Sequence, residues 1–349
     1  MIMKRIGILT PFHDNYGGGE IFLQNIAKYC NEKENEIEII IFSSDVKAFD
    51  KYNVLIPKIN SYKLFLHNYI DVCRIIKQYN IQFLILNDFF ISQFALLFRC
   101  FFKNVVSLLH GEITYNNVDN YIEKKMIILF RRLAISVGTK KIFSVNKTNI
   151  EYFSSKKIYY IGNFIVPVDC ERNLEEEYDF IYVGRFTKLK NIFRMIDVYK
   201  KYCEKYNSEA KFVMVGMGEL FEDVKVYIRD KGIDKNVQLI GFVEHNKIIE
   251  MYKKSRCLLL FSQTEGFPTV ILEALECGIP CIVSNVGSNK EVIIDYLNGF
   301  CFDLSVPDDK IVDMMNYALA MIDGEKCKEQ SRKYHIDIFW KKFCEKLFL

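Results

Sequence analysis

Residues 257–284 read CLLLFSQTEGFPTVILEALECGIPCIVS, and this stretch decides the predicted fold. Its pattern predicts a buried parallel strand, a loop, a helix and a second strand, at residues 257–261, 263–268, 269–277 and 281–284. Glu265 then follows the carboxyl end of a strand, where open α/β sheets bind ligands. The helix start beside it offers free N–H groups and a positive dipole end to a phosphate.

Glu273 lies about two turns along this helix, among apolar neighbours, and we expect it to be partly buried. An unpaired carboxylate there would be costly, so something must supply hydrogen-bond donors. Sugar or ribose hydroxyls would do so, and so would neighbouring backbone groups around a structural carboxylate. Both interpretations stay open.

Short apolar strands alternate with helical segments along the whole chain, and they fall into two runs. The first run is at residues 5–9, 37–43, 83–86, 105–109 and 141–144, and the second at 178–183, 212–215, 237–240, 257–261 and 281–284. This alternation predicts two parallel-sheet, Rossmann-like domains. We place them at residues 1–166 and 167–332, with a final helical segment at 333–349. Pro167 interrupts the pattern at the expected linker.

The net charge of +3 hides an asymmetry between the two halves. Residues 1–166 carry 21 Lys and Arg against 14 Asp and Glu, whereas residues 167–349 carry 26 against 30. The whole surplus comes from residues 99–157, with 11 basic and 4 acidic residues. Such a segment suits peripheral contact with an anionic membrane, and equally a solvated helix face. No recognised nucleic-acid motif accompanies the charge, which disfavours nucleic acid as a partner.

The chain has eleven cysteines, with no C-x-x-C pair. An odd count without metal-ligand spacing predicts a reducing cytoplasm, no disulfide scaffold and no zinc site. A strand already starts near residue 3, which leaves no room for a signal peptide. No uninterrupted apolar run approaches the ~20 residues that span a bilayer. We therefore expect a cytoplasmic protein, soluble or peripheral at the membrane.

Two loops that follow predicted strands carry residues suited to a diphosphate. In the first, Gly17 and Gly18 precede a helix and let the backbone approach a ligand closely, although tight turns also use glycines. The spacing does not fit the dinucleotide pattern G-x-G-x-x-G. In the second, VGRFTKLKN at 183–191, Arg185 and Lys190 can bracket a diphosphate by fork geometry and point charge. The alternative is a solvated basic loop.

His110 ends a buried strand, which more often marks a hydrogen-bonded core histidine than a catalytic one. It is nevertheless the strongest candidate among the five histidines, and His13 is a weaker one. Further glycines end two later strands, at Gly216 and in Gly241-Phe242.

Together these motifs resemble the retaining glycosyltransferases of family 4. The resemblance rests on Glu-Gly-Phe-Pro at 265–268, Glu273 after seven intervening residues, and Gly-x-Pro at 278–280. Gly17-Gly18, the Val-Gly-Arg…Lys-Asn run and His110 add to it. It implies an α/β protein of GT-B architecture, with two Rossmann-like parallel-sheet domains facing across a cleft and a C-terminal helix that crosses back. It also implies catalytic roles for His110, Arg185, Lys190 and Glu265.

The same resemblance implies donor-binding positions in both halves of the chain. They are Gly17, Gly18, Gly184, Gly216, Phe242, Gly266, Phe267, Pro268, Thr269, Val270 and Glu273. It predicts transfer of a sugar from a nucleoside-diphosphate sugar to a hydroxyl acceptor, such as a lipid-linked saccharide in bacterial surface-polysaccharide synthesis. The sequence has no D-x-D pair, so we expect no metal and no other cofactor. A nucleotide-sugar 2-epimerase on the same fold and a non-catalytic partner protein are the alternatives.

Overall fold

A computed structural model describes residues 4–11, 18–33, 36–44, 52–110, 121–153, 157–170 and 176–349 of the chain. The chain divides into two compact units. The first comprises residues 1–163 and 339–349, and the second comprises residues 164–338. Each unit is built around its own parallel sheet.

The sheet of the first unit consists of parallel strands throughout. Its strands are β1 (Lys4–Leu9), β2 (Ile37–Ser43), β3 (Asn53–Leu55), β4 (Phe83–Asn87), β5 (Val105–Leu109), β6 (Lys141–Ser144) and β7 (Ile158–Tyr160). They lie in the order β3-β2-β1-β4-β5-β6-β7. The central strands are almost continuously apolar because helices cover both faces of such a sheet.

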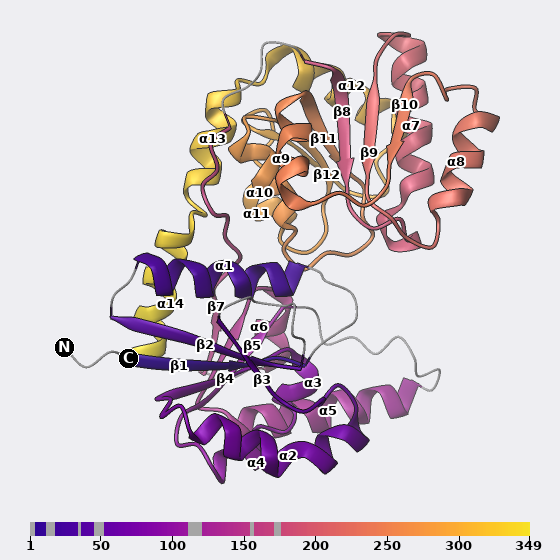
Figure 1. Cartoon of the computed structure of the whole chain (residues 1–349). Coiled ribbons are helices and arrows are strands. Elements are labelled where there is room, and N and C mark those ends of the chain that lie inside the picture. Colours follow the sequence, from indigo (N-terminus) through magenta and orange to yellow (C-terminus); the bar gives the residue numbers. More distant parts are fainter. Residues whose placement is uncertain are drawn as a thin grey trace. The chain divides into compact units, whose positions relative to one another are not determined.

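Helices pack on the two faces of this sheet. They are α1 (Gly18–Lys33), α2 (Tyr62–Lys77), α3 (Phe89–Ser92), α4 (Ala95–Arg99), α5 (Tyr121–Gly138), α6 (Thr148–Phe153) and α14 (Ile336–Phe348). Figure 1 shows α1 and α14 on one face, and α2, α4 and α5 on the other. Phe65 of α2 stacks on Phe94, just before α4, with 3.8 Å between ring centroids.

The last helix, α14, packs on the sheet and on helix α1 of the first unit through a series of aromatic contacts. Ring centroids lie 4.6–5.6 Å apart in the pairs Phe22–Phe339, Phe83–Phe348 and Phe143–Phe343. In addition, the Lys141 ammonium donates to the carbonyls of Lys346 and Leu347, at 2.6 and 3.2 Å. A cation there satisfies acceptors that the end of a helix leaves without partners.

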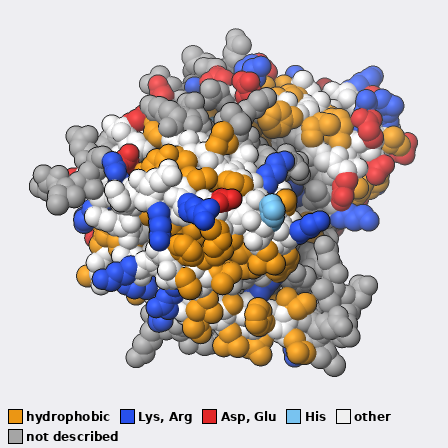
Figure 2. All heavy atoms as spheres, turned by 60° about the horizontal axis from the view of Figure 1, so that its bottom comes forward, with side chains coloured by type: hydrophobic (Ala, Val, Ile, Leu, Met, Phe, Trp, Pro, Cys, Tyr) orange, Lys and Arg blue, Asp and Glu red, His pale blue; other side chains and the backbone are white. Residues whose placement is uncertain are grey.

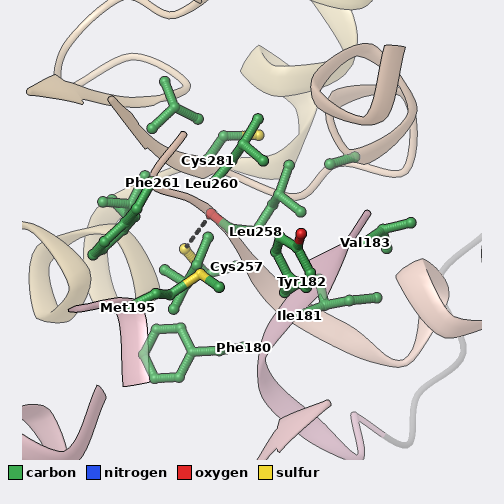
Figure 3. Close-up of a cluster of buried hydrophobic side chains, with 14 of the residues drawn as sticks. Phe180, Ile181, Tyr182, Val183, Met195, Cys257, Leu258, Leu260, Phe261 and Cys281 are labelled. Carbon is green, nitrogen blue, oxygen red and sulfur yellow. Dashed lines mark hydrogen bonds between the residues drawn. The ribbon is translucent and has the colours of Figure 1, made fainter. Parts of the chain in front are cut away.

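The second unit has a doubly wound parallel sheet. Its strands are β8 (Tyr178–Val183), β9 (Phe212–Val215), β10 (Val237–Ile240), β11 (Ser255–Leu260), β12 (Cys281–Ser284) and β13 (Gly299–Phe302). They lie in the order β10-β9-β8-β11-β12-β13. Side chains of the neighbouring strands β8 and β11 form the centre of a buried cluster, together with Met195 (Figure 3).

The helices of the second unit surround this sheet. They are the 3₁₀ turn η2 (Lys188–Lys190), α7 (Ile192–Lys205), α8 (Phe221–Asp230), α9 (His245–Lys253), α10 (Thr269–Glu276), α11 (Asn289–Val292), α12 (Asp308–Met321) and α13 (Gly324–Arg332). Gly278 follows α10 with a φ of +71°, which glycine adopts readily at a helix end.

Sequence and structure agree on the parallel α/β class and on all ten expected strands. The sequence analysis missed β3, β7 and β13. The first two have three residues each and are half-buried or exposed, so they lack the apolar run that marks a central strand. The third begins with Gly299, and glycine weakens a strand pattern. The expected helix at 269–277 agrees with α10 to within one residue, a difference within the normal range of assignments, and the expected final helical segment at 333–349 contains α14.

One pair of cysteines departs from the expectation of a chain without disulfides. Cys170, in the segment before β8, and Cys277, at the end of α10, form a disulfide. The expectation is therefore wrong for this pair, whose members lie 107 residues apart and carry no spacing signal. The other nine cysteines are not disulfide-bonded.

Among the described residues, no helix is both long enough and apolar enough to cross a bilayer.

Candidate active site

The strand order of the second unit reverses between β8 and β11, because β9 and β10 lie on one side of β8 and β12 and β13 lie beyond β11. The loops that follow these two strands therefore diverge at the same edge of the sheet. In open α/β sheets, such a reversal creates the crevice in which ligands bind. Both predicted donor-site motifs, at residues 184–191 and 263–268, occupy this edge.

Lys190 and Glu265 meet across the reversal and form an ion pair through the Lys190 ammonium and Glu265 Oε1. Their side chains are only 21% and 11% exposed. The Ser262 hydroxyl donates to the same carboxylate oxygen at 2.5 Å. Burial and the charge of Glu265 raise the pKa of the neighbouring Tyr182 hydroxyl, which keeps it neutral. The arrangement holds a cation and an anion side by side, one in the loop after β8 and the other in the loop after β11.

The backbone of the loop after β8 is held close to that of the loop after β9. Gly216 has a φ of +132°, and a Cβ there would lie 2.0 Å from the Gly184 carbonyl oxygen. Only glycine fits such an approach. The Tyr182 hydroxyl donates to the Arg185 carbonyl at 2.8 Å, which fixes the backbone while the Arg185 side chain stays exposed.

The helix α10 begins at this edge, directly after the Glu265 loop. Pro268 stands at its N-cap, and Thr269 and Val270 form its half-buried first turn. The loop is supported from behind by the Ser288 N–H, which donates to the Gly266 carbonyl at 3.1 Å. Gly287, with a φ of +55°, would place a Cβ 2.2 Å from the Glu265 carbonyl oxygen. The helix start can thus offer its N–H groups and dipole to an anion.

Phe267 is buried at 7% exposure, with its ring centroid 5.7 Å from that of Tyr334. Gly266 beside it is half-buried. Phe242, in the loop after β10, is 80% exposed and extends into solvent. Phe267 therefore anchors the loop, whereas Phe242 presents a free aromatic face.

Glu273 is buried at 7% exposure, and two side chains of one other helix, α9, contact it. His245 Nε2, at the start of α9, lies 3.1 Å from Oε1, and the Tyr252 hydroxyl donates to Oε2 at 3.3 Å. The hydrogen bond to Glu273 raises the pKa of His245. In the part of the chain that the structure describes, side chains of α9 therefore supply hydrogen-bond partners to this carboxylate.

A second carboxylate of α10 is held in a similar way. Glu276 Oε2 accepts a hydrogen bond from the Ser331 hydroxyl at 2.5 Å and lies 3.0 Å from His335 Nε2. This cluster ties α10 to α13 and to His335, which lies three residues after the end of α13. It fixes the helix that carries Glu273 but lies away from its N-terminal end.

His110 lies in the first unit, at the carboxyl end of β5. Its Nε2 is 2.8 Å from Asn87 Oδ1, and the Phe22 ring meets it edge-on with centroids 4.7 Å apart. Burial lowers the pKa of His110 to about 4, so the imidazole is neutral at pH 7. Gly17 and His13 lie outside the described residues, and Gly18 is the first residue of α1.

The structure thus gathers Gly184, Arg185, Lys190, Gly216 and residues 265–270 at one edge of the second unit. Phe242 and Glu273 belong to the same unit, and His110 and Gly18 to the other. Sequence reasoning missed Ser262, Gly287, Tyr182, His245 and Tyr252. Of these, only Gly287 carries a local signal, as a glycine shortly after a strand, because the others act through contacts with residues distant in sequence.

Two Rossmann-like parallel sheets, one with these loops at its reversal point, are the elements of the GT-B fold. Residues 170–334 match the family described as "Glycosyl transferases group 1". The matched residues belong to the second unit and include the Val-Gly-Arg…Lys-Asn and Glu-Gly-Phe-Pro motifs on which the resemblance to family 4 rests.

Individual relatives and one solved structure agree with this assignment. The chain is 34% identical over 151 residues to "UDP-Gal:alpha-D-GlcNAc-diphosphoundecaprenol alpha-1,3-galactosyltransferase" of Escherichia coli, covering 39% of this chain and 38% of that protein. It is 26% identical over 315 residues to "Capsular polysaccharide biosynthesis glycosyltransferase CapH" of Staphylococcus aureus, covering 84% of each. The structure of Anabaena HepE with UDP-glucose superposes with a TM-score of 0.79, at 15% identity and 99% coverage of both chains. That last likeness concerns the fold alone.

Proposed function

We propose that this glycosyltransferase moves a sugar, with retention of configuration, from a nucleoside-diphosphate sugar to a hydroxyl of a lipid-linked saccharide in bacterial surface-polysaccharide synthesis. The observation that carries the proposal is the convergence of Arg185, Lys190, Glu265 and the start of α10 at the β8/β11 reversal. Two basic side chains and a helix N-terminus suit a diphosphate.

The similar proteins support the choice of substrate class. The galactosyltransferase of E. coli is named for a UDP-sugar donor and a diphosphoundecaprenol-linked acceptor, and CapH is named for capsular polysaccharide. HepE was solved with UDP-glucose. The surplus of basic residues at 99–157 adds a reason to expect peripheral contact with an anionic membrane, where a lipid-linked acceptor resides.

In the proposed reaction, the acceptor oxygen bonds to the anomeric carbon on the face from which the diphosphate leaves. As the bond from that carbon to the phosphate oxygen breaks, an oxygen of the departing diphosphate takes the proton of the acceptor hydroxyl. Arg185, Lys190 and the Thr269 end of α10 stabilise the growing negative charge of the leaving group. Glu265 holds sugar hydroxyls, Glu273 holds ribose hydroxyls, and His110 contacts the transferred sugar.

The protein's own groups supply the positive charge in this scheme, and therefore turnover should persist in EDTA. Loss of activity in the chelator, with recovery on adding magnesium or manganese, would contradict that part of the proposal.

Two measurements test the proposal as a whole. A panel of nucleotide sugars is first screened for a rise in melting temperature, since a ligand of the folded state stabilises it by mass action. Release of nucleoside diphosphate is then measured with and without a polyprenyl-diphosphate saccharide, and the anomeric configuration of the product is read by NMR. Release that needs the acceptor, with retention, supports the proposal. Release without any acceptor indicates an epimerase-type reaction, and an inverted product refutes the mechanism.

A further inference from the structure

The first unit presents an unusual surface on the outer side of its helices α2, α4 and α5. Figure 2 shows hydrophobic side chains gathered on this face, with Lys and Arg side chains around them. The large apolar residues exposed there are Tyr62, Leu66, Ile70, Leu96, Leu97, Met126, Leu129, Phe130, Leu133 and Val137, each between 39% and 71% exposed. We call these ten residues the apolar face. Contiguous exposed apolar surface on a protein usually marks an interaction site.

Helix α5 exposes a row of its apolar residues to solvent. Met126, Phe130, Leu133 and Val137 follow one another at intervals of four, three and four residues, so they share one side of the helix. Ile135, on the opposite side, is fully buried against the protein. An ordinary surface helix directs polar residues to solvent. Here the described residues of the first unit cover one apolar side of the helix and leave the other exposed.

The three helices form one continuous surface because specific contacts join them. The Arg131 guanidinium of α5 donates to the Tyr62 hydroxyl of α2 at 3.2 Å and to Gln93 Oε1 at 3.1 Å. The Arg99 guanidinium at the end of α4 donates to the Val137 carbonyl of α5 at 2.9 Å. The outward sides of α2, α4 and α5 are therefore held together as one face.

The charges on these helices are nearly all positive. The basic residues whose side chains the structure describes on these helices are Lys63, Arg74, Lys77, Arg99, Lys125, Arg131 and Arg132. Among the side chains that the structure describes on α2, α4 and α5, Asp71 is the only acid, and it pairs with Arg74 at 3.0 Å. On α5, Lys125 and Arg132 lie about 110° and 130° around the helix from the middle of the apolar stripe, on the same side of it. These two cations therefore border the apolar stripe of α5 along one side.

We propose that the apolar face docks on a bilayer containing anionic lipid, with its apolar side chains among the lipid headgroups and its flanking cations on the phosphates. An apolar stripe flanked by Lys and Arg is the pattern of helices that lie in the membrane interface. The inference rests on the proposed function in one respect, that the lipid-linked acceptor gives the enzyme a reason to reside at a membrane.

This assignment differs from a purely electrostatic attraction by residues 99–157. It includes α2, which precedes that segment, and it leaves out Lys141, whose ammonium is engaged at the end of α14. Because apolar burial contributes, binding should weaken in high salt but persist in part, since salt screens charge and not apolar contact.

Fluorescence can locate the docked surface, because the chain contains a single tryptophan. Trp340 is buried, and its indole N–H has no hydrogen-bond partner among the described residues. Trp340→Phe therefore gives a variant without tryptophan fluorescence, into which a single new tryptophan can be placed. In that background, Phe130→Trp should shift its emission to the blue on adding phosphatidylcholine/phosphatidylglycerol vesicles. The matched control is Val226→Trp, at a residue of α8 that is 54% exposed on the second unit, and it should not shift.

Vesicle flotation then measures the strength of binding. Phe130→Asp should lower partitioning onto the mixed vesicles about tenfold or more, because one large apolar side chain no longer inserts. Arg132→Ala should lower it about fivefold, and Val226→Asp should leave it unchanged. All three positions are partly or well exposed, so the variants should fold.

The proposal is overturned if Phe130→Asp floats like the wild type, if pure phosphatidylcholine vesicles bind equally well, or if both tryptophan probes shift alike. It is also overturned if sedimentation shows a dimer that Phe130→Asp dissociates, since the face would then join two copies of the chain. The vesicles contain no saccharide and no nucleotide, so this test is independent of transferase activity. Failure of every nucleotide sugar to raise the melting temperature would refute the proposed function and leave the docking result standing.

Discussion

Arg185 and Lys190 were predicted to act alike on the diphosphate, and the structure now separates them. The exposed Arg185 side chain extends from its loop, whereas Lys190 pairs with Glu265 at 21% and 11% side-chain exposure. If both stabilise the leaving group, Arg185→Ala and Lys190→Ala should each lower kcat about a hundredfold, corresponding to roughly 3 kcal/mol. Only Lys190→Ala should also destabilise the fold.

The stability cost can be bracketed from the burial of the pair. Removing one partner of a fully buried ion pair costs about 3–5 kcal/mol, and an exposed pair contributes at most ~1 kcal/mol. This pair is intermediate, and Glu265 keeps the Ser262 hydroxyl as a donor, so we expect a loss of about 2 kcal/mol. Arg185→Ala should change the free energy of unfolding by no more than ~0.5 kcal/mol, as most exposed substitutions do.

Urea unfolding and steady-state kinetics on the same preparations test both statements. The double variant Lys190→Met/Glu265→Gln, which removes both charges together, should recover part of the lost stability and none of the turnover. If Lys190→Ala kept full kcat, the ammonium would serve the fold alone. If Arg185→Ala kept full kcat, the assignment of the leaving-group site at the β8/β11 reversal would have to be abandoned.

Three further predictions concern the rest of the site. Glu273→Ala should raise KM for the donor with a smaller effect on kcat, because ribose contacts do not change along the reaction. A lowered melting temperature with unchanged nucleotide affinity would show that the carboxylate is purely structural. His245 has a raised pKa in the folded protein, so its stabilisation is complete below the unfolded value of about 6.5 and is lost as pH rises through the folded pKa. The Tm difference between wild type and His245→Gln should therefore shrink between mildly acidic and alkaline pH, and a constant difference would refute the coupling to Glu273. Gly216→Ala would place a Cβ 2.0 Å from the Gly184 carbonyl oxygen. It should therefore lower the free energy of unfolding by at least about 1 kcal/mol and weaken donor binding. Unaltered melting and donor affinity would contradict the close approach.

The motifs that sequence reasoning could find are local ones. Glu265, Gly266, Pro268 and Glu273 lie within nine residues of one another, and a strand, loop and helix in succession place them at the carboxyl edge of a sheet. The regular alternation of apolar strands and helices predicts the parallel class for the same reason, because periodicity is a property of neighbours along the chain.

Contacts between distant residues required the tertiary structure. His245 and Tyr252 reach Glu273 from 28 and 21 residues away, and Lys190 reaches Glu265 over 75. Nothing in the local sequence distinguishes these side chains from solvated ones. The disulfide between Cys170 and Cys277 was missed for the same reason.

The apolar face also shows which features the sequence determines and which require the tertiary structure. Sequence alone determined that residues 99–157 carry a surplus of positive charge and many apolar residues, and both a solvated helix and a membrane contact agreed with it. The structure decided which side of α5 is covered by the protein and which is exposed, and it joined α2 to the same surface. A helix pattern shows that one side is apolar, but only the packing of the other elements shows whether that side faces the core or the solvent.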